Sequence, residues 1–366
     1  MEASDPMPFE SASLDILLRL CQVEGFTVRH LRSLRQESRY PCLPEMEGGD
    51  LQGILRKGID ALTSTRAGEK ALGIREACCR GGIRIVPFGS GDYPPLLRGI
   101  PDAPPVLFLV GGNIALENSV AIVGSRSPTD AAVEFAGLLA SDLACAGWTI
   151  VSGMARGIDA AAHEGALRGG GTTLAVLGCG VDIVYPPQAA GLRTRILRRG
   201  GLLSEYPPGT KPLPYRFPAR NRIISGVSRG VVVVEAAARS GALITARIAL
   251  EQGREVMAVP GNPIHAHTAG SNRLIRDGAI PVTGAEDVVA ALGWIQPVPP
   301  SGSRERRIMD FLDKARRVDD IAEALDIPPQ ELLPCLLEME MAKLLERGAG
   351  DYYKKASESP GGISRY

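Results

Sequence analysis

Three short segments of this 366-residue chain have the residue types of an anion site. Each follows an apolar run: the first holds Gly124, Ser125, Arg126 and Ser127, the second Gly153, Arg156 and Gly157, and the third Ser240 and Gly241. Glycine allows a tight turn, and the free N–H groups of a following helix bind phosphate together with hydroxyl and guanidinium groups. Because the carboxyl ends of parallel strands meet at one edge of a sheet, we expect these segments to line one crevice. The alternative is three ordinary strand-to-helix turns, since none holds the Gly-Lys-Ser/Thr of a P-loop or a complete G-x-G-x-x-G fingerprint.

Basic side chains are concentrated between residues 193 and 222. Eight of them stand against the single acid Glu205, a local net charge of +7, and they are Arg193, Arg195, Arg198, Arg199, Lys211, Arg216, Arg220 and Arg222. A patch of this size can neutralise several phosphates. Asn221 adds an amide between two guanidinium groups, and Phe217 and Tyr215 could stack on unpaired bases. For the four arginines up to residue 199, we favour a solvated helix face.

Few other side chains could do chemistry. Asp159 and His163 would share a helix face, either as an acid–base pair or, as we favour, as a helix cap and a packed polar group. Glu205 and Glu235 are the carboxylates closest to the expected crevice, and we expect them to hydrogen-bond loops. The two histidines of residues 265–267 lack a neighbouring cysteine or carboxylate cluster, and no cysteine has a histidine partner. We expect no catalytic residue, no metal ion and no cofactor.

The elements that would position these residues alternate between strand and helix. Short apolar runs bounded by glycine or proline predict strands at 83–86, 106–110, 120–123, 149–151, 173–177, 231–234 and 255–259. Helical stretches separate the runs from residue 120 onward. The sequence therefore predicts an α/β fold with an extended Rossmann-like, doubly wound, mostly parallel sheet.

Five segments are expected along the chain. They are an N-terminal helical domain of the SAM or helix-hairpin-helix type (1–78), a Rossmann-like core (79–295), a proline-rich linker (296–303), a winged helix (304–356) and a disordered tail (357–366). The first is indicated by an apolar stripe with helical spacing that begins at Leu14. The winged helix is indicated by three helical segments and a hairpin that turns at residues 348–350.

Composition excludes several classes of protein. The 43 glycines and the 5% aromatic content fit parallel α/β layers better than a β-sandwich or a disordered chain. No apolar stretch approaches the roughly 20 residues of a membrane span, and we find no secretory signal at the N-terminus. The seven cysteines form no C-x-x-C pair, so we expect reduced thiols in a cytoplasmic protein. The 41 basic and 41 acidic side chains give no net charge, which argues against a nucleic-acid partner until the local +7 segment is considered.

The order and spacing of these segments resemble the DNA-processing protein A family (DprA, also called Smf). The resemblance covers about residues 100–280 and is carried by residues 123–126, 152–163, 185–186, 204–205, 217–226, 235–236, 240–246, 259–261 and 270–275. It implies a core that binds single-stranded DNA without sequence preference and protects incoming strands during natural transformation. It also implies loading of RecA recombinase, a homodimer and no established catalysis.

The resemblance also implies roles for individual residues. Gly124, Ser125 and Arg126 would hold phosphates at a helix N-terminus, and Arg220 and Asn221 would line the same basic pocket. The flanking contacts would be Lys211, Arg216 and Phe217, and the remaining walls Gly153, Arg156, Ser240 and Gly241. The backbone would come close to phosphate at Gly124, Gly153, Gly157 and Gly241. The helix near residues 287–292 is expected to form part of the dimer surface.

Two segments depart from the family pattern. The N-terminal Glu24-Gly25-Phe26-Thr27 lacks the second glycine of a helix-hairpin-helix turn, so DNA contact there and a structural or partner-binding role stay open. The recognition helix of the winged helix, at 328–340, holds three acids, no Lys or Arg, and an internal Pro334. Because phosphate would repel this helix, we predict that the winged helix binds a protein rather than duplex DNA.

Two other function classes remain open. One is a nucleotide-hydrolysing enzyme of the lysine-decarboxylase-like Rossmann fold, whose Pro-Gly-Gly-x-Gly-Thr motif and following Glu are not matched at residues 240–245. The other is a nucleotide-sensing scaffold.

Overall fold

The chain divides into two compact units. The computed structural model describes residues 14–37, 49–112, 114–293, 304–341, 344–348 and 350–356. The units are Met1–Leu292 and Gly293–Tyr366, and each has its own apolar core. The predicted linker (296–303) and the predicted disordered tail (357–366) lie outside the described residues.

The first unit begins with helices that share its core. They are α1 (Leu14–Leu20), α2 (Val28–Glu37), α3 (Gly49–Thr63) and α4 (Thr65–Gly81). Helix α1 buries Leu17 and Leu18 of the predicted apolar stripe, and it also buries Leu20, which the stripe did not include. The amide of Val28 donates to the carbonyl oxygen of Ala103, 2.9 Å away, which joins the start of α2 to the core. Helix α4 runs through residue 81, so the predicted domain boundary after residue 78 lies within its last turn.

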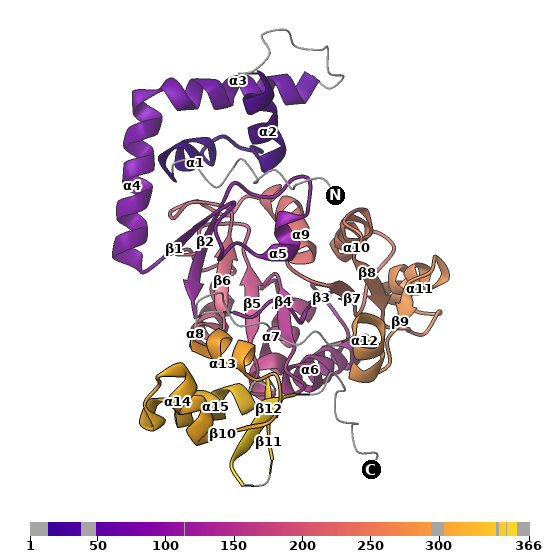
Figure 1. Cartoon of the computed structure of the whole chain (residues 1–366). Helices are drawn as coiled ribbons and strands as arrows, with labels where there is room; N and C mark the ends of the chain where they lie inside the picture. The colour runs from indigo at the N-terminus through magenta and orange to yellow at the C-terminus, as the bar shows by residue number, and fades with distance from the viewer. Residues whose placement is uncertain are drawn as a thin grey trace. The chain divides into compact units, whose positions relative to one another are not determined.

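A nine-stranded sheet forms the centre of the unit, in the order β1-β2-β6-β5-β4-β3-β7-β8-β9 (Figure 1). The strands are β1 (Arg84–Pro87), β2 (Val106–Gly111), β3 (Ser119–Val123), β4 (Thr149–Ser152), β5 (Thr173–Val176), β6 (Gly201–Ser204), β7 (Gly230–Val233), β8 (Glu255–Ala258) and β9 (Ile280–Pro281). From β6 to β9 in this order every pairing is parallel, whereas β1 and β2 pair antiparallel. The predicted α/β class with a mostly parallel sheet is confirmed.

The direction in which strands are added reverses between β3 and β7. The connecting helices are α5 (Pro95–Arg98), α6 (Asp130–Cys145), α7 (Ile158–Arg168), α8 (Ala190–Arg199), α9 (Arg216–Gly226), α10 (Gly241–Glu251), α11 (Ala269–Arg276) and α12 (Ala285–Leu292), with short 3-10 turns at Pro187–Ala189 and Ala266–Thr268. Because parallel crossovers are right-handed, α6, α7 and α8 cover one face of the sheet, and α9 and α10 cover the other. The packing agrees, since α7 contacts α6 and α8 while α9 contacts α10. Such a reversal leaves a crevice at the carboxyl ends of the two strands.

All seven predicted strands are present within one or two residues of the predicted bounds. Two strands of the sheet were missed. Strand β6 has only Leu202 and Leu203 between a glycine and a serine, and β9 is two residues long. Runs this short give no periodic signal, and their strand conformation depends on the neighbouring strands.

The second unit is a small α+β domain. It contains α13 (Arg304–Phe311), α14 (Val318–Leu325), α15 (Pro329–Met341) and the antiparallel sheet β10-β12-β11, whose strands are Arg316–Arg317, Tyr352–Lys355 and Leu345–Arg347. Its core is formed by Ile308, Leu312, Ile321, Leu332, Leu336 and Tyr353, with others. The predicted winged-helix elements are confirmed, and Pro334 is accommodated inside α15.

Helices α6 and α7 approach each other through two glycines. A Cβ added at Gly165 would lie 2.9 Å from the Cα and the carbonyl carbon of Gly137. These are backbone atoms, so the contact can be relieved only by separating the helices.

We expect Gly165→Ala to lower the free energy of unfolding by about 1–3 kcal/mol, because it overpacks this helix contact. Gly73→Ala is the matched control, since a Cβ at this position in α4 meets nothing within 4 Å. It should be neutral or stabilise the chain by up to about 1 kcal/mol. Urea unfolding measures both variants, and equal effects would contradict the close contact.

Candidate functional site

A pocket of about 490 Å³ lies at the crevice where the strand order reverses. Its walls come from the turn after β3, the start of α9 and the turn between β7 and α10. Among the residues that line it are Gly124, Ser125, Arg126, Ser127, Phe217, Arg220, Asn221, Arg239, Ser240 and Gly241. We call this cavity the switch-point pocket. It brings the first and third predicted turns together, on either side of α9.

The second predicted turn, after β4, lines an adjoining cavity of about 90 Å³. Gly153 and Arg156 lie there beside Tyr185, and Arg126, Phe217 and Arg220 line both cavities. Gly157 precedes α7 and packs on the carbonyl oxygen of Ser125. The three predicted turns therefore meet at one edge of the sheet.

The guanidinium of Arg220 is buried at the base of both cavities. The residue is 3% exposed, and its Nη1 donates to the carbonyl oxygens of Gly153, at 2.8 Å, and of Val176. Its Nε donates to the carboxamide oxygen of Asn221 at 3.2 Å. Burial lowers the pKa of Arg220, and the nearby Asp159 carboxylate opposes that shift. Arg220 thus presents buried positive charge and fixes the side chain of its neighbour.

Two aromatic rings lie beside the buried guanidinium of Arg220. The rings of Tyr185 and Phe217 are stacked with centroids 5.2 Å apart. The guanidinium carbon of Arg126 lies 5.8 Å from the centroid of Phe217, and that of Arg220 lies 6.0 Å from it. Rings next to guanidinium groups can stack on a nucleobase while the cations bind the adjacent phosphate.

Three exposed arginines surround the site. Arg126 and Arg156 come from the first two turns, and Arg239 lies just before the third. None of them forms an ion pair with a carboxylate in the described part of the chain. Their charges are therefore available to an anion. Arg239 and Tyr185 were not predicted as site residues, although Arg239 directly precedes the 240–246 segment and Tyr185 lies within the 185–186 segment.

Two hydroxyl groups order the turns. Ser240 caps α10, since its side chain accepts from the amide of Ala242 at 3.3 Å. The hydroxyl of Ser125 accepts from the amide of Ser127 at 3.1 Å. The first turn of α10 faces the pocket, and helix N-termini carry partial positive charge.

Three of the four glycines that are expected to come close to phosphate are tightly packed within the protein. A Cβ at Gly124 would lie 2.7 Å from the side chain of Ile158, and one at Gly153 would lie 2.7 Å from Arg220 Nη2 and Asp159 Oδ2. At Gly157 it would collide with the carbonyl oxygen of Ser125. Only Gly241 of these four faces open space. The first three are therefore required by contacts within the protein.

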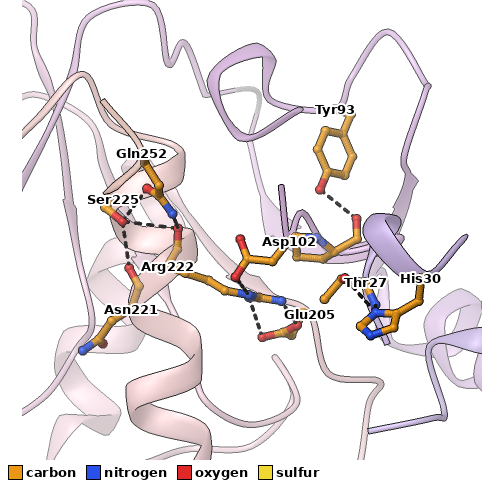
Figure 2. Close-up of polar contacts among 10 residues, drawn as sticks. Thr27, His30, Tyr93, Asp102, Glu205, Asn221, Arg222, Ser225 and Gln252 are labelled. Carbon is orange, nitrogen blue, oxygen red and sulfur yellow. Dashed lines mark hydrogen bonds and ion pairs between the residues drawn. The ribbon is translucent and has the colours of Figure 1, made fainter. Parts of the chain in front are cut away.

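The remaining predicted contacts lie outside the switch-point pocket. Arg222, on the same helix as Arg220, forms a two-pronged ion pair with Glu205 at 2.7 and 3.0 Å and approaches Asp102 at 3.2 Å (Figure 2). These carboxylates raise the pKa of Arg222 against the effect of burial. Arg216 lies over the ring of Tyr206 and 3.5 Å from Glu24, and its Nη1 donates to the carbonyl oxygen of Lys211. Both arginines line cavities beside the N-terminal helices.

Helix α8 exposes Arg195, Arg198 and Arg199, as the predicted solvated face requires, but most of its arginines also contact the protein. Arg193 donates to the carbonyl oxygen of Val181, Arg195 pairs with Glu164, and Arg199 donates to the carbonyl oxygen of Gly170. The local charge of +7 is therefore not the charge that the pocket presents.

The candidate acid–base groups are also engaged in structural contacts. His163 is fully buried, and its Nδ1 lies 2.6 Å from the hydroxyl of Thr173, which donates to the carbonyl oxygen of Ile150. Burial raises the pKa of Asp159, whose Oδ2 accepts from the amide of Ala155 at 3.3 Å. Glu235 accepts from the hydroxyl of Thr129 at 2.7 Å, and Glu205 is held by Arg222. Both glutamates bind other elements, as the sequence suggested.

The described residues hold neither a metal-binding cluster nor a membrane-spanning helix. Within them, no cluster of three or more histidine, cysteine or acidic side chains could hold a metal ion. The same part of the chain has no helix that is long and apolar enough to cross a membrane.

Comparison with known proteins identifies the family. A family model of DNA recombination-mediator protein A matches residues 84–293, and a model of the DprA winged helix domain matches residues 295–351. Protein Smf of Escherichia coli K12 is 40% identical over 287 residues, which are 74% of this chain and 77% of that protein. The chain belongs to the DNA recombination-mediator protein A (DprA/Smf) family.

Solved structures agree with this assignment. The X-ray structure of DNA processing protein A from Streptococcus pneumoniae matches with a TM-score of 0.64 at 34% identity, over 78% of this chain and 99% of that one. DNA processing protein A from Helicobacter pylori matches with a TM-score of 0.52 at 29% identity, over 57% of this chain and 95% of that one. The latter structure addresses the single-stranded DNA binding mode of the Helicobacter protein.

We expect Arg222→Met to lower the free energy of unfolding by about 3 kcal/mol, because it leaves Glu205 as a buried, unpaired carboxylate. The two side chains are only 11% and 14% exposed. Arg247→Met is the matched control, since its pair with Glu251 is 75% and 64% exposed and should contribute less than about 1 kcal/mol. Chemical denaturation measures the free energy of unfolding of both variants, and similar losses of stability would refute the structural role of Arg222.

We expect His163 to destabilise the protein in acid. Burial lowers its pKa from 6.5 to about 3, so below about pH 6.5 the unfolded chain binds a proton that the folded chain does not. The resulting loss of stability grows by up to about 1.4 kcal/mol per pH unit as the pH falls. The free energy of unfolding of His163→Gln, relative to that of the wild type, should therefore rise by about 2 kcal/mol when the pH falls from about 7.5 to about 5. Urea unfolding at both values measures the difference, and a constant difference would show that His163 is not held neutral.

Proposed function

We propose that this protein binds single-stranded DNA, without sequence preference, in the switch-point pocket and its adjoining cavity. The observation that carries the proposal is the stacked pair Tyr185 and Phe217 beside arginines that no described carboxylate neutralises. Guanidinium groups bind any phosphate and ring faces stack on any base, so neither reads sequence. The single-stranded DNA binding mode described for the Helicobacter pylori relative supports the proposal.

The residues of the pocket have different roles in the proposed DNA binding, according to where they lie. Arg126, Arg156 and Arg239 are the exposed phosphate ligands, while Arg220 supplies fixed positive charge from below. Ser125, Ser127, Ser240 and Gly241 add hydroxyl and amide donors at the mouth of the pocket, together with Asn221. Gly124, Gly153 and Gly157 let the turns pack closely enough to bring these groups together. Lys211, Arg216 and Arg222 do not line this pocket, and Arg216 and Arg222 line cavities beside the N-terminal helices instead.

Family membership supports the wider role that we propose. The protein protects recombining or incoming strands, loads RecA recombinase onto them and acts as a homodimer without catalysis. Glu205 and Glu235 fit a role without catalysis, because both carboxylates hold neighbouring elements. In helix α12, Val288 and Leu292 are buried within this chain, so its exposed residues would have to supply any dimer contact. No disulfide bond is formed by Cys21, Cys78, Cys79, Cys145 or Cys179, which fits the proposed cytoplasmic location.

We expect Arg126→Ala/Arg239→Ala to weaken binding of a labelled oligothymidylate and to flatten its salt dependence. Two lost phosphate contacts on a single strand reduce the slope of log affinity against log salt by about 1.4. Fluorescence anisotropy across a salt series measures the slope, with Arg247→Ala as the control, an exposed arginine in α10 that does not line the pocket. An unchanged slope in the double variant would mean that phosphates bind elsewhere.

A further inference from the structure

Helix α15 of the second unit has two apolar faces. One packs into the core through Leu332, Cys335, Leu336 and Met339, which follow helical spacing. The other is a stripe of Leu333, Leu337 and Met341, four residues apart and exposed by 50%, 54% and 78%. Pro334 is exposed beside it. A surface helix of a small domain needs only one apolar face, so the second stripe requires its own explanation.

Charge is distributed unevenly around this stripe. Helix α15 contains Glu331, Glu338 and Glu340 and no Lys or Arg, and exposed acids continue on α14 at Asp319, Asp320 and Glu323. No Lys or Arg lies on α14 or α15. The basic residues of the described part of the unit lie on α13, in the loop that follows it and on the strands, at Arg304, Arg306, Arg307, Lys314, Arg316, Arg317, Arg347, Lys354 and Lys355. An occupant of the stripe therefore meets apolar side chains within a negative field.

We propose that the stripe Leu333–Leu337–Met341 is a docking surface for an amphipathic helix of a partner protein, whose apolar residues are flanked by lysine or arginine. Leucine and methionine spaced four apart form the ridge that packs into the groove of a second helix. The acids beside them attract basic flanks and select against acidic ones. This inference goes beyond the proposed DNA binding, which uses the first unit.

Three other candidate occupants of the stripe fit less well: an undescribed segment of this chain, a second copy of the chain and duplex DNA. The segments 1–13, 38–48, 294–303 and 357–366 lie outside the described residues, and in none of them do Lys and Arg outnumber Asp and Glu. A symmetric contact with a second copy would place acid against acid across a two-fold axis. Duplex DNA would bring phosphate against the same acids.

The test uses full-length protein and synthetic peptides of about 18 residues, long enough to form a helix on binding. The probe peptide has leucines on one face and lysines on the others. One comparison peptide carries Glu in place of every Lys, and a second carries Ser in place of every Leu. Fluorescence anisotropy should show the probe binding at least about tenfold more tightly than either comparison peptide.

Variants then locate the binding. Leu333→Ser/Leu337→Ser should weaken binding of the probe by about tenfold or more. Leu138→Ser is the matched control, an exposed leucine of α6 at 52%, and it should change nothing. All substituted side chains are exposed, so thermal melting should be unaffected. Binding of oligothymidylate should also be unchanged, which separates a failure of this inference from a failure of the proposed function.

Several outcomes would overturn the inference. They are no measurable binding of the probe, equal binding of the Glu peptide, or probe binding that survives the double substitution. Self-association lost in Leu333→Ser/Leu337→Ser, seen by sedimentation, would assign the stripe to a second copy. Loss of duplex DNA binding in that variant would assign it to nucleic acid.

Discussion

A buried guanidinium at the edge of the sheet holds the candidate site together. Arg220 projects from α9 onto the carbonyl oxygens of Gly153 and Val176, which follow or end two neighbouring strands. A buried cation without such acceptors would cost several kcal/mol, so α9 is tied to this position. The position in turn requires glycine at 153, because a Cβ there would occupy the space of the guanidinium. Phe217 lies one helical turn before Arg220, so the same contact fixes the aromatic wall of the site.

The strand order determines which turns can join that helix. Strands β3 and β7 are neighbours although more than a hundred residues separate them, and the reversal between them opens the crevice. Glu235, just after β7, binds Thr129 at the start of α6, which locks the two turns to each other. With the turn after β4, three turns each contribute an exposed arginine to the two cavities, and these are Arg126, Arg156 and Arg239. The site is thus a property of the topology, and no single segment contains it.

The sequence predicted the fold well and the site in part, for reasons that differ by residue. Apolar runs such as Val231–Val234 are local signals, so the strands and the convergence of three turns could be inferred. The direction in which a side chain points is not local. Arg220 and Arg222 are two residues apart in one helix, so they face different sides: one lies under the pocket and the other pairs with Glu205. The acceptors lie far away in sequence, and no count of basic residues could separate the two roles.

The balance of charges shows why it matters which arginines are paired within the protein and which are not. The chain has no net charge, and within residues 193–222 the side chains of Arg195, Arg216 and Arg222 are paired with carboxylates of the protein. Long-range attraction of a polyanion is therefore weak, and affinity must come from cations that remain unpaired at short range. Three unpaired arginines beside two stacked rings satisfy that condition for the single-stranded DNA that we propose as the ligand. In a duplex the base faces are stacked on one another, so the rings would gain no partner.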